Sequence, residues 1–272
     1  MNISSVTAVY YSATGNTQRV TESIAQKISE EWNTPFHVFD FSYPKNRAPQ
    51  SYGPNDLVVF GTPVYAGRIP NKILPFIQTL FQGNGALAVP VVTFGNRSFD
   101  NALIELREEL EQHGFHTIAA GAFPAQHAFS DKLAKGRPDD GDMEIIARFA
   151  DDIAGKVRTL THIPEPVFVP GTEPIAGYYT PLGIDGKPAA FLKAKPKTRE
   201  TCTDCKACVA VCPMGSIDFD NPALVPGVCI KCHACVKACP LQSKYFDDPA
   251  FLSHVAMLEQ TYGERAKVEV FL

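Results

Sequence analysis

The chain of 272 residues is long enough for two unequal domains. Hydrophobic residues make up 45% and charged residues 20% of the sequence, which are ordinary globular values and exclude a disordered or collagen-like chain. The formal net charge of −4 does not indicate a nucleic-acid binder, and no apolar run reaches the roughly 18–20 residues of a membrane span. The N-terminus lacks a basic stretch followed by an apolar core, so we expect no secretory signal and a cytoplasmic protein.

Residues 1–160 alternate short apolar runs with segments of helical periodicity. The runs predict strands at 6–11, 36–41, 56–61, 88–95 and 117–122. Those around 58–60 and 89–94 are almost continuously apolar, as strands of a buried parallel sheet are. Between strands, apolar residues such as Val20, Ile24 and Ile28 recur every four positions and indicate one face of a helix. Strand–helix alternation repeated five times predicts an open, doubly wound α/β domain.

The chain changes character after this first domain. Its last helix is predicted to begin at Asp142, whose side chain can cap it. Residues 161–200 are rich in proline and end in a basic stretch, which predicts a largely irregular linker. Residues 201–272 form the second predicted domain, and its tail has the pattern of a short helix and then a strand at 267–272. We assign no chemistry to the tail and expect it to pack against one of the domains.

All eight cysteines lie in two copies of a repeat, residues 202–219 and 229–246. Each copy reads Cys-x-x-Cys-x-x-Cys-x-x-x-Cys-Pro, a spacing that gives three thiolates to one 4Fe–4S cluster and the fourth to the other cluster. The first cluster is therefore assigned Cys202, Cys205, Cys208 and Cys239, and the second Cys229, Cys232, Cys235 and Cys212. Because the ligands cross between copies, the metals hold together a region too small for a large core.

Three alternatives to iron–sulfur fit the cysteines less well. Zinc also uses paired Cys-x-x-Cys elements, but the third cysteine and the Cys-Pro, each present twice, favour iron–sulfur. Residues 229–233 match a c-type haem attachment signature, yet Lys206 occupies the position equivalent to His233 in the other copy. Disulfides are disfavoured in a reducing cytosol. The repeat resembles the bacterial two-cluster ferredoxins, which implies a small α+β domain with two 4Fe–4S clusters.

A hydroxyl-rich loop, residues 11–17, follows the first predicted strand and leads directly into a helix. Such a loop binds phosphate through backbone N–H groups, hydroxyls and the helix N-terminus. It lacks the Gly-Lys-Ser/Thr of nucleotide-hydrolysing loops, so such a loop is not expected. It also lacks Gly-x-Gly-x-x-Gly, so a bound dinucleotide is not expected. Two further loops, 61–68 and 95–99, follow the third and fourth strands and meet the first loop where ligands bind in doubly wound sheets.

On these loops the chain resembles the flavodoxin family, and as a whole it resembles bacterial fusions of a flavodoxin-like domain with a two-cluster ferredoxin. The resemblance implies a strand order of 2-1-3-4-5 and an FMN whose phosphate lies in the first loop. It implies Tyr65 as the first and Phe99 as the second candidate to stack on the flavin, and a Gly67 peptide free to rotate toward it. The implied FMN-binding residues are Ser12, Thr14, Gly15, Asn16, Thr17, Thr62, Pro63, Val64, Tyr65, Gly67, Gly95, Asn96, Arg97 and Phe99.

The sequence departs from long-studied flavodoxins in two ways. The only tryptophan, Trp32, lies outside the flavin loops, and Arg68 and Arg97 stand where those proteins surround the ring with acidic groups. Positive charge near the flavin favours two-electron reduction. His127, in the loop after the fifth strand, has no partner visible in the sequence and is interpreted as inert.

These features predict intramolecular electron transfer between two 4Fe–4S clusters and FMN, relaying low-potential electrons between redox partner proteins. The alternative is a terminal FMN-dependent reductase of a small acceptor, of quinone or nitro type, fed by its own ferredoxin domain. The lack of recognisable substrate-pocket residues favours the carrier, and the two arginines favour the reductase. A purely structural role for the clusters leaves the flavin loops unexplained. We expect no catalytic residue, and oxygen-sensitive clusters suggest an anaerobic host.

Overall fold

The apolar runs of the N-terminal part form one sheet in the computed structural model, which describes residues 2–272. Its long strands are β1 (Ser5–Tyr10), β2 (Phe36–Asp40), β4 (Asp56–Pro63), β6 (Leu87–Phe94) and β8 (Ala120–Pro124), and its short ones β7 (His116–Thr117) and β11 (Glu269–Phe271). The order is β11-β8-β6-β4-β1-β2, with β7 beside β6. The five long strands are parallel and confirm the predicted order of 2-1-3-4-5.

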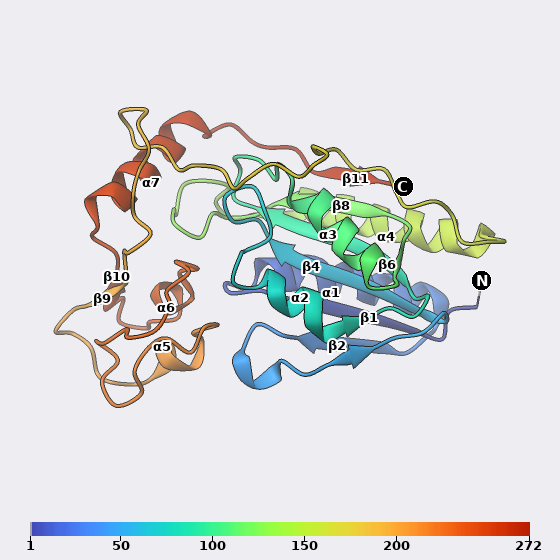
Figure 1. Ribbon diagram of the computed structural model, residues 1–272, viewed down its shortest axis with the longest axis horizontal. Coiled ribbons are helices and arrows are strands. Elements are labelled where there is room, and N and C mark those ends of the chain that lie inside the picture. The colour runs from blue at the N-terminus through green and yellow to red at the C-terminus, as the bar shows by residue number, and fades with distance from the viewer. Residues whose placement is uncertain (1) are drawn as a thin grey trace.

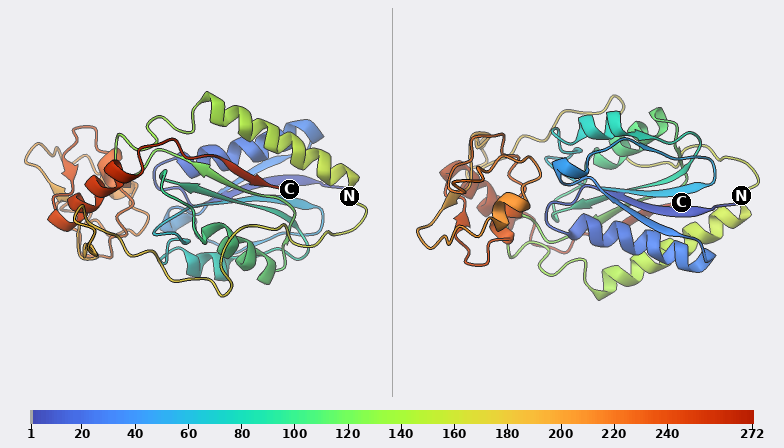
Figure 2. Two further views of the ribbon diagram at one scale, coloured as in Figure 1. Left: turned by 90° about the horizontal axis from the view of Figure 1, so that it is seen from above. Right: turned by 90° about the horizontal axis from the view of Figure 1, so that it is seen from below.

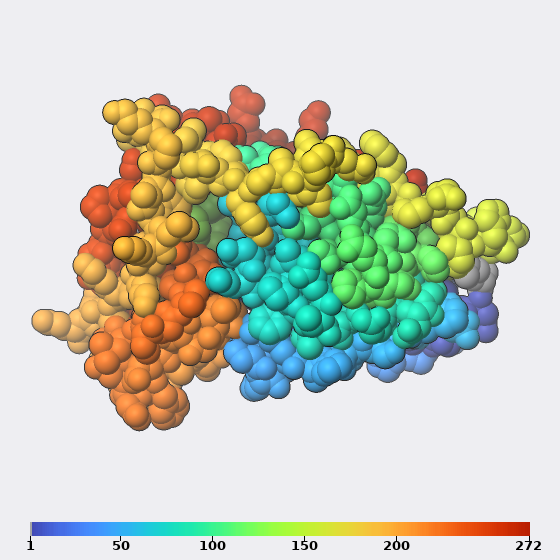
Figure 3. Space-filling view, viewed as in Figure 1, coloured from blue at the N-terminus to red at the C-terminus, as the bar shows by residue number. Residues whose placement is uncertain are grey.

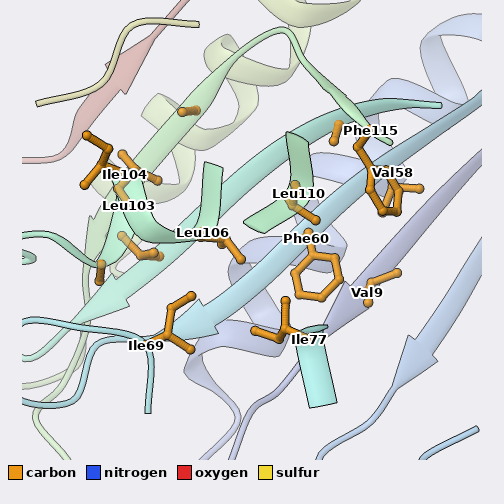
Figure 4. Close-up of a cluster of buried hydrophobic side chains, with 14 of the residues drawn as sticks. Val9, Val58, Phe60, Ile69, Ile77, Leu103, Ile104, Leu106, Leu110 and Phe115 are labelled. Carbon is orange, nitrogen blue, oxygen red and sulfur yellow. The ribbon is translucent and has the colours of Figure 1, made fainter. Parts of the chain in front are cut away.

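Helices cover both faces of this sheet (Figure 2). On one face lie α1 (Asn16–Trp32) and α4 (Asp140–Thr159), and on the other α2 (Leu74–Leu80) and α3 (Ala102–Gln112). Each face has its own buried core: Ile24 and Phe149 pack on the first, Phe60 and Leu106 on the second. Figure 4 shows the second core, where aromatic and aliphatic side chains from the strands meet those of α2 and α3.

Between β2 and β4 the chain forms the 3-10 turn η1 (Pro44–Asn46) and the short strand β3 (Gln50–Ser51). β3 pairs in parallel with β5 (Phe81–Gln82), which follows α2, as a separate two-stranded sheet. This segment brings Arg47 to the edge of the sheet that faces the cysteine-rich region, where its guanidinium donates to Pro213 O at 2.7 Å.

Helix α4 begins two residues before the predicted position, because Asp139 rather than Asp142 caps it. The side chain of Asp139 accepts a hydrogen bond from Asp142 N, and the side chain of Asp142 accepts one from Asp139 N. This reciprocal capping box places Asp142 inside the first turn. There its carboxylate is buried and pairs with Arg137 at 2.6 Å and with Arg265, from the C-terminal tail, at 2.9 Å.

The connector, residues 161–196, holds no helix or strand in the described chain. It runs back along the sheet unit toward the cysteine-rich region and is yellow in Figure 1. Part of it is packed rather than free, because Val167 and Val169 are buried in the core beside α3. Further on, the N–H of Tyr179 donates to Ala66 O at 2.8 Å, so the connector also reaches a loop at the edge of the sheet.

The cysteine-rich region contains only short elements before its last helix. These are β9 (Lys197–Thr198), α5 (Ala207–Ala210), α6 (Ala234–Lys237) and β10 (Lys244–Tyr245), followed by α7 (Pro249–Thr261). Strands β9 and β10 pair antiparallel, and α5 and α6 occupy equivalent positions of the sequence repeat. A low density of regular structure is expected where bound metal rather than a large core supplies the stability.

The tail forms the predicted helix and strand, and the strand returns to the first unit. β11 pairs antiparallel with β8, with Val270 opposite Gly121. Residues 269–271 therefore complete the N-terminal sheet, although they follow the cysteines in sequence (Figure 1). None of the helices in residues 2–272 combines the length and the hydropathy that crossing a bilayer requires.

Replacing Arg137 with alanine is expected to lower the free energy of unfolding by about 3 kcal/mol, because it leaves the carboxylate of Asp142 buried with only Arg265 beside it. The exposed pair Lys27–Asp151 supplies the control, and K27A should cost less than about 1 kcal/mol. Chemical denaturation of the full chain, followed by far-ultraviolet circular dichroism, measures both. Equal effects of the two substitutions would contradict the role given to Arg137.

Candidate cofactor sites

The loop between β1 and α1 is shaped by its own hydroxyl groups and one glycine. Gly15, the residue before α1, has a φ of 89°, a left-handed conformation that favours glycine. The hydroxyl of Ser12 accepts from Gln18 N at 3.1 Å, and Ser12 N donates to the hydroxyl of Ser42 at 2.7 Å. The hydroxyl of Thr17 lies 2.7 Å from that of Thr93 on β6. These bonds fix the loop at the N-terminus of α1, the kind of position at which proteins bind phosphate groups.

A cavity of about 560 Å³ lies at the carboxyl edge of the sheet, within the size range of cofactor sites. We call it the edge cavity. The three loops predicted to bind FMN all contribute to its wall. Of the predicted residues, the wall includes Thr14, Asn16, Thr17, Pro63, Val64, Tyr65, Gly67, Gly95 and Arg97. Loops that are far apart in sequence thus converge because their strands are neighbours and parallel.

Five predicted residues do not line the edge cavity: Ser12, Gly15, Thr62, Asn96 and Phe99. Ser12 and Gly15 shape the first loop instead, and Thr62 is fully buried in β4. Phe99, the second stacking candidate, is 7% exposed and packs on Phe94 in the core, with 5.7 Å between ring centroids. Its sequence position gave no sign of this, because an aromatic residue in a short loop can face either the core or the ligand.

Asn96 is turned away from the cavity by the C-terminal tail. Its side-chain amide donates to Tyr262 O at 2.6 Å and to Glu264 O at 2.7 Å. Its carbonyl oxygen accepts from Ala266 N at 3.2 Å. Asn96 therefore binds the segment that joins α7 to β11, a partner more than 160 positions away that the local sequence does not reveal.

Hydrogen bonds hold the peptide at Gly67 in place. It is therefore not free to rotate, although the resemblance implied that it would be. The carbonyl oxygen of the preceding residue, Ala66, accepts a hydrogen bond from Tyr179 N at 2.8 Å. The carbonyl oxygen of Gly67 accepts one from Asn101 N at 3.0 Å. The side chain of Asp100 lies so close that a Cβ at position 67 would collide with it. The left-handed φ of 78° at Gly67 also favours glycine. The connector, through Tyr179, thus fixes the conformation of this loop.

The two arginines of the flavin loops are both paired with carboxylates. Arg68 does not line the cavity, and its guanidinium binds Glu105 through two hydrogen bonds, of 2.9 and 2.5 Å. Arg97 lines the cavity, pairs with Asp100 and lies over the ring of Tyr179, 4.2 Å from its centroid. Neither arginine brings an uncompensated positive charge to the cavity, which weakens the argument for the reductase.

His127, for which no partner is visible in the sequence, lines the edge cavity. Its Nδ1 accepts from Phe129 N at 3.0 Å, and its ring lies against Gly95, where any side chain would collide with it. Burial, and next the nearby His254, lower the pKa of His127 to about 4. The imidazole is therefore neutral near pH 7. Its partner is a backbone N–H, a kind of contact that residue identities do not show.

Replacing His127 with glutamine is expected to make stability less sensitive to acid between pH 6.5 and 4. In the folded chain His127 stays neutral to about pH 4, whereas in the unfolded chain it binds a proton below its ordinary pKa of 6.5. The unfolded state therefore binds more protons in this window, and stability falls as pH falls through it. Denaturation midpoints at several pH values measure the slope. If the dependence of stability on pH is the same in H127Q as in wild type, the imidazole of His127 is not buried in its neutral form.

The eight cysteines gather around two separate voids. One is lined by Cys202, Cys205, Cys208 and Cys239, and the other by Cys212, Cys229, Cys232 and Cys235. The structure thus brings together the two sets expected from the spacing, with the fourth cysteine of each copy beside the other copy. No three His, Cys, Asp or Glu side chains in residues 2–272 are arranged to hold a single metal ion. Four thiols around a void are the donor set of a polynuclear iron–sulfur cluster.

Backbone geometry around the two voids follows the repeat. Asp204 and Lys231 are equivalent and have φ values of 57° and 56°, and Lys206 and His233 are equivalent with 62° each. Such left-handed conformations in non-glycine residues cost about 1–3 kcal/mol each and persist at functional sites. Turns that include left-handed residues form backbone concavities that bind anionic groups such as cluster sulfurs.

Hydrogen bonds to sulfur repeat in the same way. Ser216 N donates to Cys212 Sγ at 3.3 Å, and Ser243 N donates to Cys239 Sγ at 3.2 Å, in equivalent positions. Burial raises the pKa of the thiols of Cys232 and Cys235 to about 12. Such thiols are deprotonated only with compensation from a cation, which iron supplies as it binds.

The two voids differ in exposure. Cys202 and Cys205 are exposed at the first, whereas Cys232 and Cys235 are buried at the second. We call them the outer and the inner cysteine sites. Phe246 lines the inner site, whereas its equivalent Phe219 is 65% exposed and does not line the outer site. The outer site therefore lacks the aromatic cover of the inner one.

The inner cysteine site adjoins the edge cavity. Cys229, Ile230 and Lys231 line both, so one short loop separates them. The two units are in contact here, and Figure 3 shows the cysteine-rich region (orange) against the N-terminal unit (blue and teal). Arg47 fixes the contact, because its guanidinium donates to Pro213 O, next to Cys212, and to Ser42 O.

Serine substitutions at equivalent positions test the two cysteine sites. We expect C205S and C232S each to lose about half of the iron, because each removes one thiol from a different cysteine site. Iron and acid-labile sulfide per chain, measured after anaerobic purification, give the result. Loss of all iron from C205S alone would contradict two separate sites, and retention of all iron in both would contradict the ligand assignment.

Two family models match separate parts of the chain. Residues 8–114 match the family model of the flavodoxin domain, and residues 201–243 match that of the 4Fe-4S dicluster domain. No curated protein matches the chain. A flavodoxin from the domain Archaea is similar at 18% identity over 57% of this chain and 99% of its own, with a TM-score of 0.41. Rubredoxin oxygen:oxidoreductase from Desulfovibrio gigas is similar at 16% identity over 58% of this chain and 37% of its own, with a TM-score of 0.42.

Proposed function

We propose how electrons move through this chain, which is a fusion of a flavodoxin domain with a 4Fe–4S dicluster domain. The flavodoxin domain implies FMN and the dicluster domain implies iron–sulfur, so the chain serves electron transfer between them. We assign FMN to the edge cavity and one 4Fe–4S cluster to each cysteine site. When bound, the clusters exchange single electrons and FMN takes one or two.

The wall between the inner cysteine site and the edge cavity carries the proposal. Cys229, Ile230 and Lys231 line both spaces, so a centre held by Cys229 lies one loop away from a ligand in the cavity. Electron transfer slows steeply with distance, and the residues that line the outer cysteine site do not line the edge cavity. The inner site is therefore the direct partner of the flavin, and the outer site lies one step further away.

Exposure supports the outer cysteine site as the place where electrons enter or leave. Cys202 and Cys205 are exposed, whereas the inner site is enclosed by its own loops and by Phe246. A redox partner protein that docks at the outer site exchanges electrons with the flavin through the inner one. The chain then relays low-potential electrons between partner proteins. Fusion in one chain makes the internal steps independent of diffusion.

A second function, reduction of a small two-electron acceptor at the flavin, is favoured by one observation. The edge cavity continues beyond the flavin loops to side chains of the connector and of α7, among them Tyr178, Phe191 and Leu258. This mostly apolar continuation has the character of a site for a flat molecule such as a quinone or a nitroaromatic compound. Access for such a molecule depends on how much of the cavity FMN fills.

The order of the centres is tested by removing one at a time. With a small low-potential electron-transfer protein as donor, we expect C205S and C232S each to slow flavin reduction at least tenfold. With a small inorganic reductant that reaches both cysteine sites, only C232S should slow it. Anaerobic stopped-flow absorbance at the flavin band measures the rates, with wild type as reference. Flavin reduction in C232S at the wild-type rate would contradict the inner site as the obligatory step.

An anaerobic redox titration separates the carrier from the reductase. Flavin reduction in two resolved one-electron steps is expected for a carrier, because its partners exchange electrons singly. A single two-electron step would favour the reductase and direct attention to quinone and nitro acceptors. Absence of a flavin spectrum from protein purified with its clusters would overturn both functions.

A further inference from the structure

Two histidines from distant parts of the chain line the edge cavity together. His127 belongs to the loop after β8, and His254 belongs to α7, in the tail to which the sequence assigned no chemistry. The cavity wall thus combines one imidazole from the N-terminal unit with one from the tail. Both rings are fixed by aromatic neighbours: His127 meets Phe129 edge-on at 5.0 Å, and His254 stacks on Phe191 at 5.3 Å.

The backbone fixes opposite tautomers in the two rings. His127 Nδ1 accepts from Phe129 N at 3.0 Å, so in the neutral ring the hydrogen resides on Nε2. His254 Nδ1 lies 2.8 Å from Leu182 O, a pure acceptor, so there the hydrogen resides on Nδ1 and Nε2 carries a lone pair. The Nε2 of His127 is thus a donor and that of His254 an acceptor.

Both rings are neutral near pH 7, so the donor and acceptor roles hold there. Burial is the main cause that lowers the pKa of each ring. His254 is 5% exposed. Neither Nε2 has a hydrogen-bond partner in residues 2–272, and neither is among the fully enclosed polar atoms. Neither Nε2 atom is therefore fully enclosed, and both rings line the edge cavity.

Contacts between α7 and the N-terminal unit keep the pair in place. Glu259 accepts from the hydroxyl of Ser130 and from Lys132, both at 2.7 Å, and so joins α7 to the loop of His127. Asn96 holds the chain just after α7, as described above. Asn96 belongs to the same loop as Gly95 and Arg97. Its bonds to the chain after α7 therefore connect the helix that carries His254 directly to one of the flavin loops.

A donor and an acceptor in the wall of one cavity match a ligand edge that carries a carbonyl oxygen next to an N–H. The isoalloxazine of FMN has such an imide edge at its pyrimidine ring, where N3–H lies between two carbonyl groups. We propose that His127 and His254 bind this edge, His127 Nε2–H donating to a flavin carbonyl and His254 Nε2 accepting from N3–H. The proposal rests on the assignment of FMN to the edge cavity.

Binding of FMN and of 3-methyl-FMN to flavin-free full chain that retains its clusters tests the pair. 3-Methyl-FMN has no N3–H but keeps its carbonyls. We expect wild type to bind it about tenfold more weakly than FMN, and H254F, which keeps the stacking on Phe191, to bind the two equally. H127F should bind both flavins about tenfold more weakly than wild type does, because it loses the hydrogen bond to a flavin carbonyl that both flavins have. It should keep the preference for FMN, because His254 can still accept from N3–H. Quenching of flavin fluorescence measures the dissociation constants.

Matched variants separate a lost hydrogen bond from a disturbed fold. H254Q and H127Q keep a polar atom near Nε2 and should recover part of the lost affinity. H113F removes an imidazole whose ring nitrogens bind backbone carbonyls far from the cavity, and it should change neither affinity nor preference. A preference for FMN that is the same in H254F and wild type would overturn the proposal for His254. If H127F binds FMN with the same affinity as wild type, the proposal for His127 is overturned. No binding of FMN by wild type would instead refute the proposed function.

Discussion

The chain leaves its sheet unit, builds the cysteine-rich region, and then returns to the same sheet, and the rest of the structure depends on this return. The connector holds the outgoing path through Tyr179, and the pairing of β11 with β8 holds the returning path. Between these two attachments the cysteine-rich region is placed at the carboxyl edge of the sheet, where parallel strands deliver their loops. The two attachments, together with the bond from Arg47 to Pro213 O, hold the loop of Cys229 beside the edge cavity.

The edge cavity is consequently built by three parts of the chain. Flavodoxin-type loops form one side, the inner cysteine loop forms another, and the connector with α7 covers the remainder. The buried pair of Arg137 and Asp142, joined by Arg265 from the tail, shows the same design at the N-terminus of α4. There the buried carboxylate of Asp142, in the first unit, forms an ion pair with Arg265, which follows the linker in sequence. The two units are therefore not independent in packing.

Local patterns sufficed to predict the strands, their order, the two sets of cysteines and most of the loops around the cavity. Periodicity and motif spacing are properties of neighbouring residues, and parallel strands bring their loops together without further information. The direction of single side chains was not predictable in the same way. Phe99 turns into the core, Asn96 binds backbone after α7, and His127 takes its partner from a backbone N–H. Asn96 depends on the distant tail, which no local pattern reveals. Phe99 and His127 instead contact near neighbours, Phe94 and Phe129, and residue identities alone do not distinguish such contacts from contacts with a ligand.

The short strand β11 also changes how the sheet presents itself to other molecules. Without it, β8 would leave the backbone groups of Ala120 and its neighbours unpaired along a fully buried, apolar strand. β11 covers them and itself spans only three residues, two of them exposed and the first a glutamate. Short, charged edges are poor templates for strand addition from a second chain. The tail thus guards this side of the sheet against edge-to-edge aggregation.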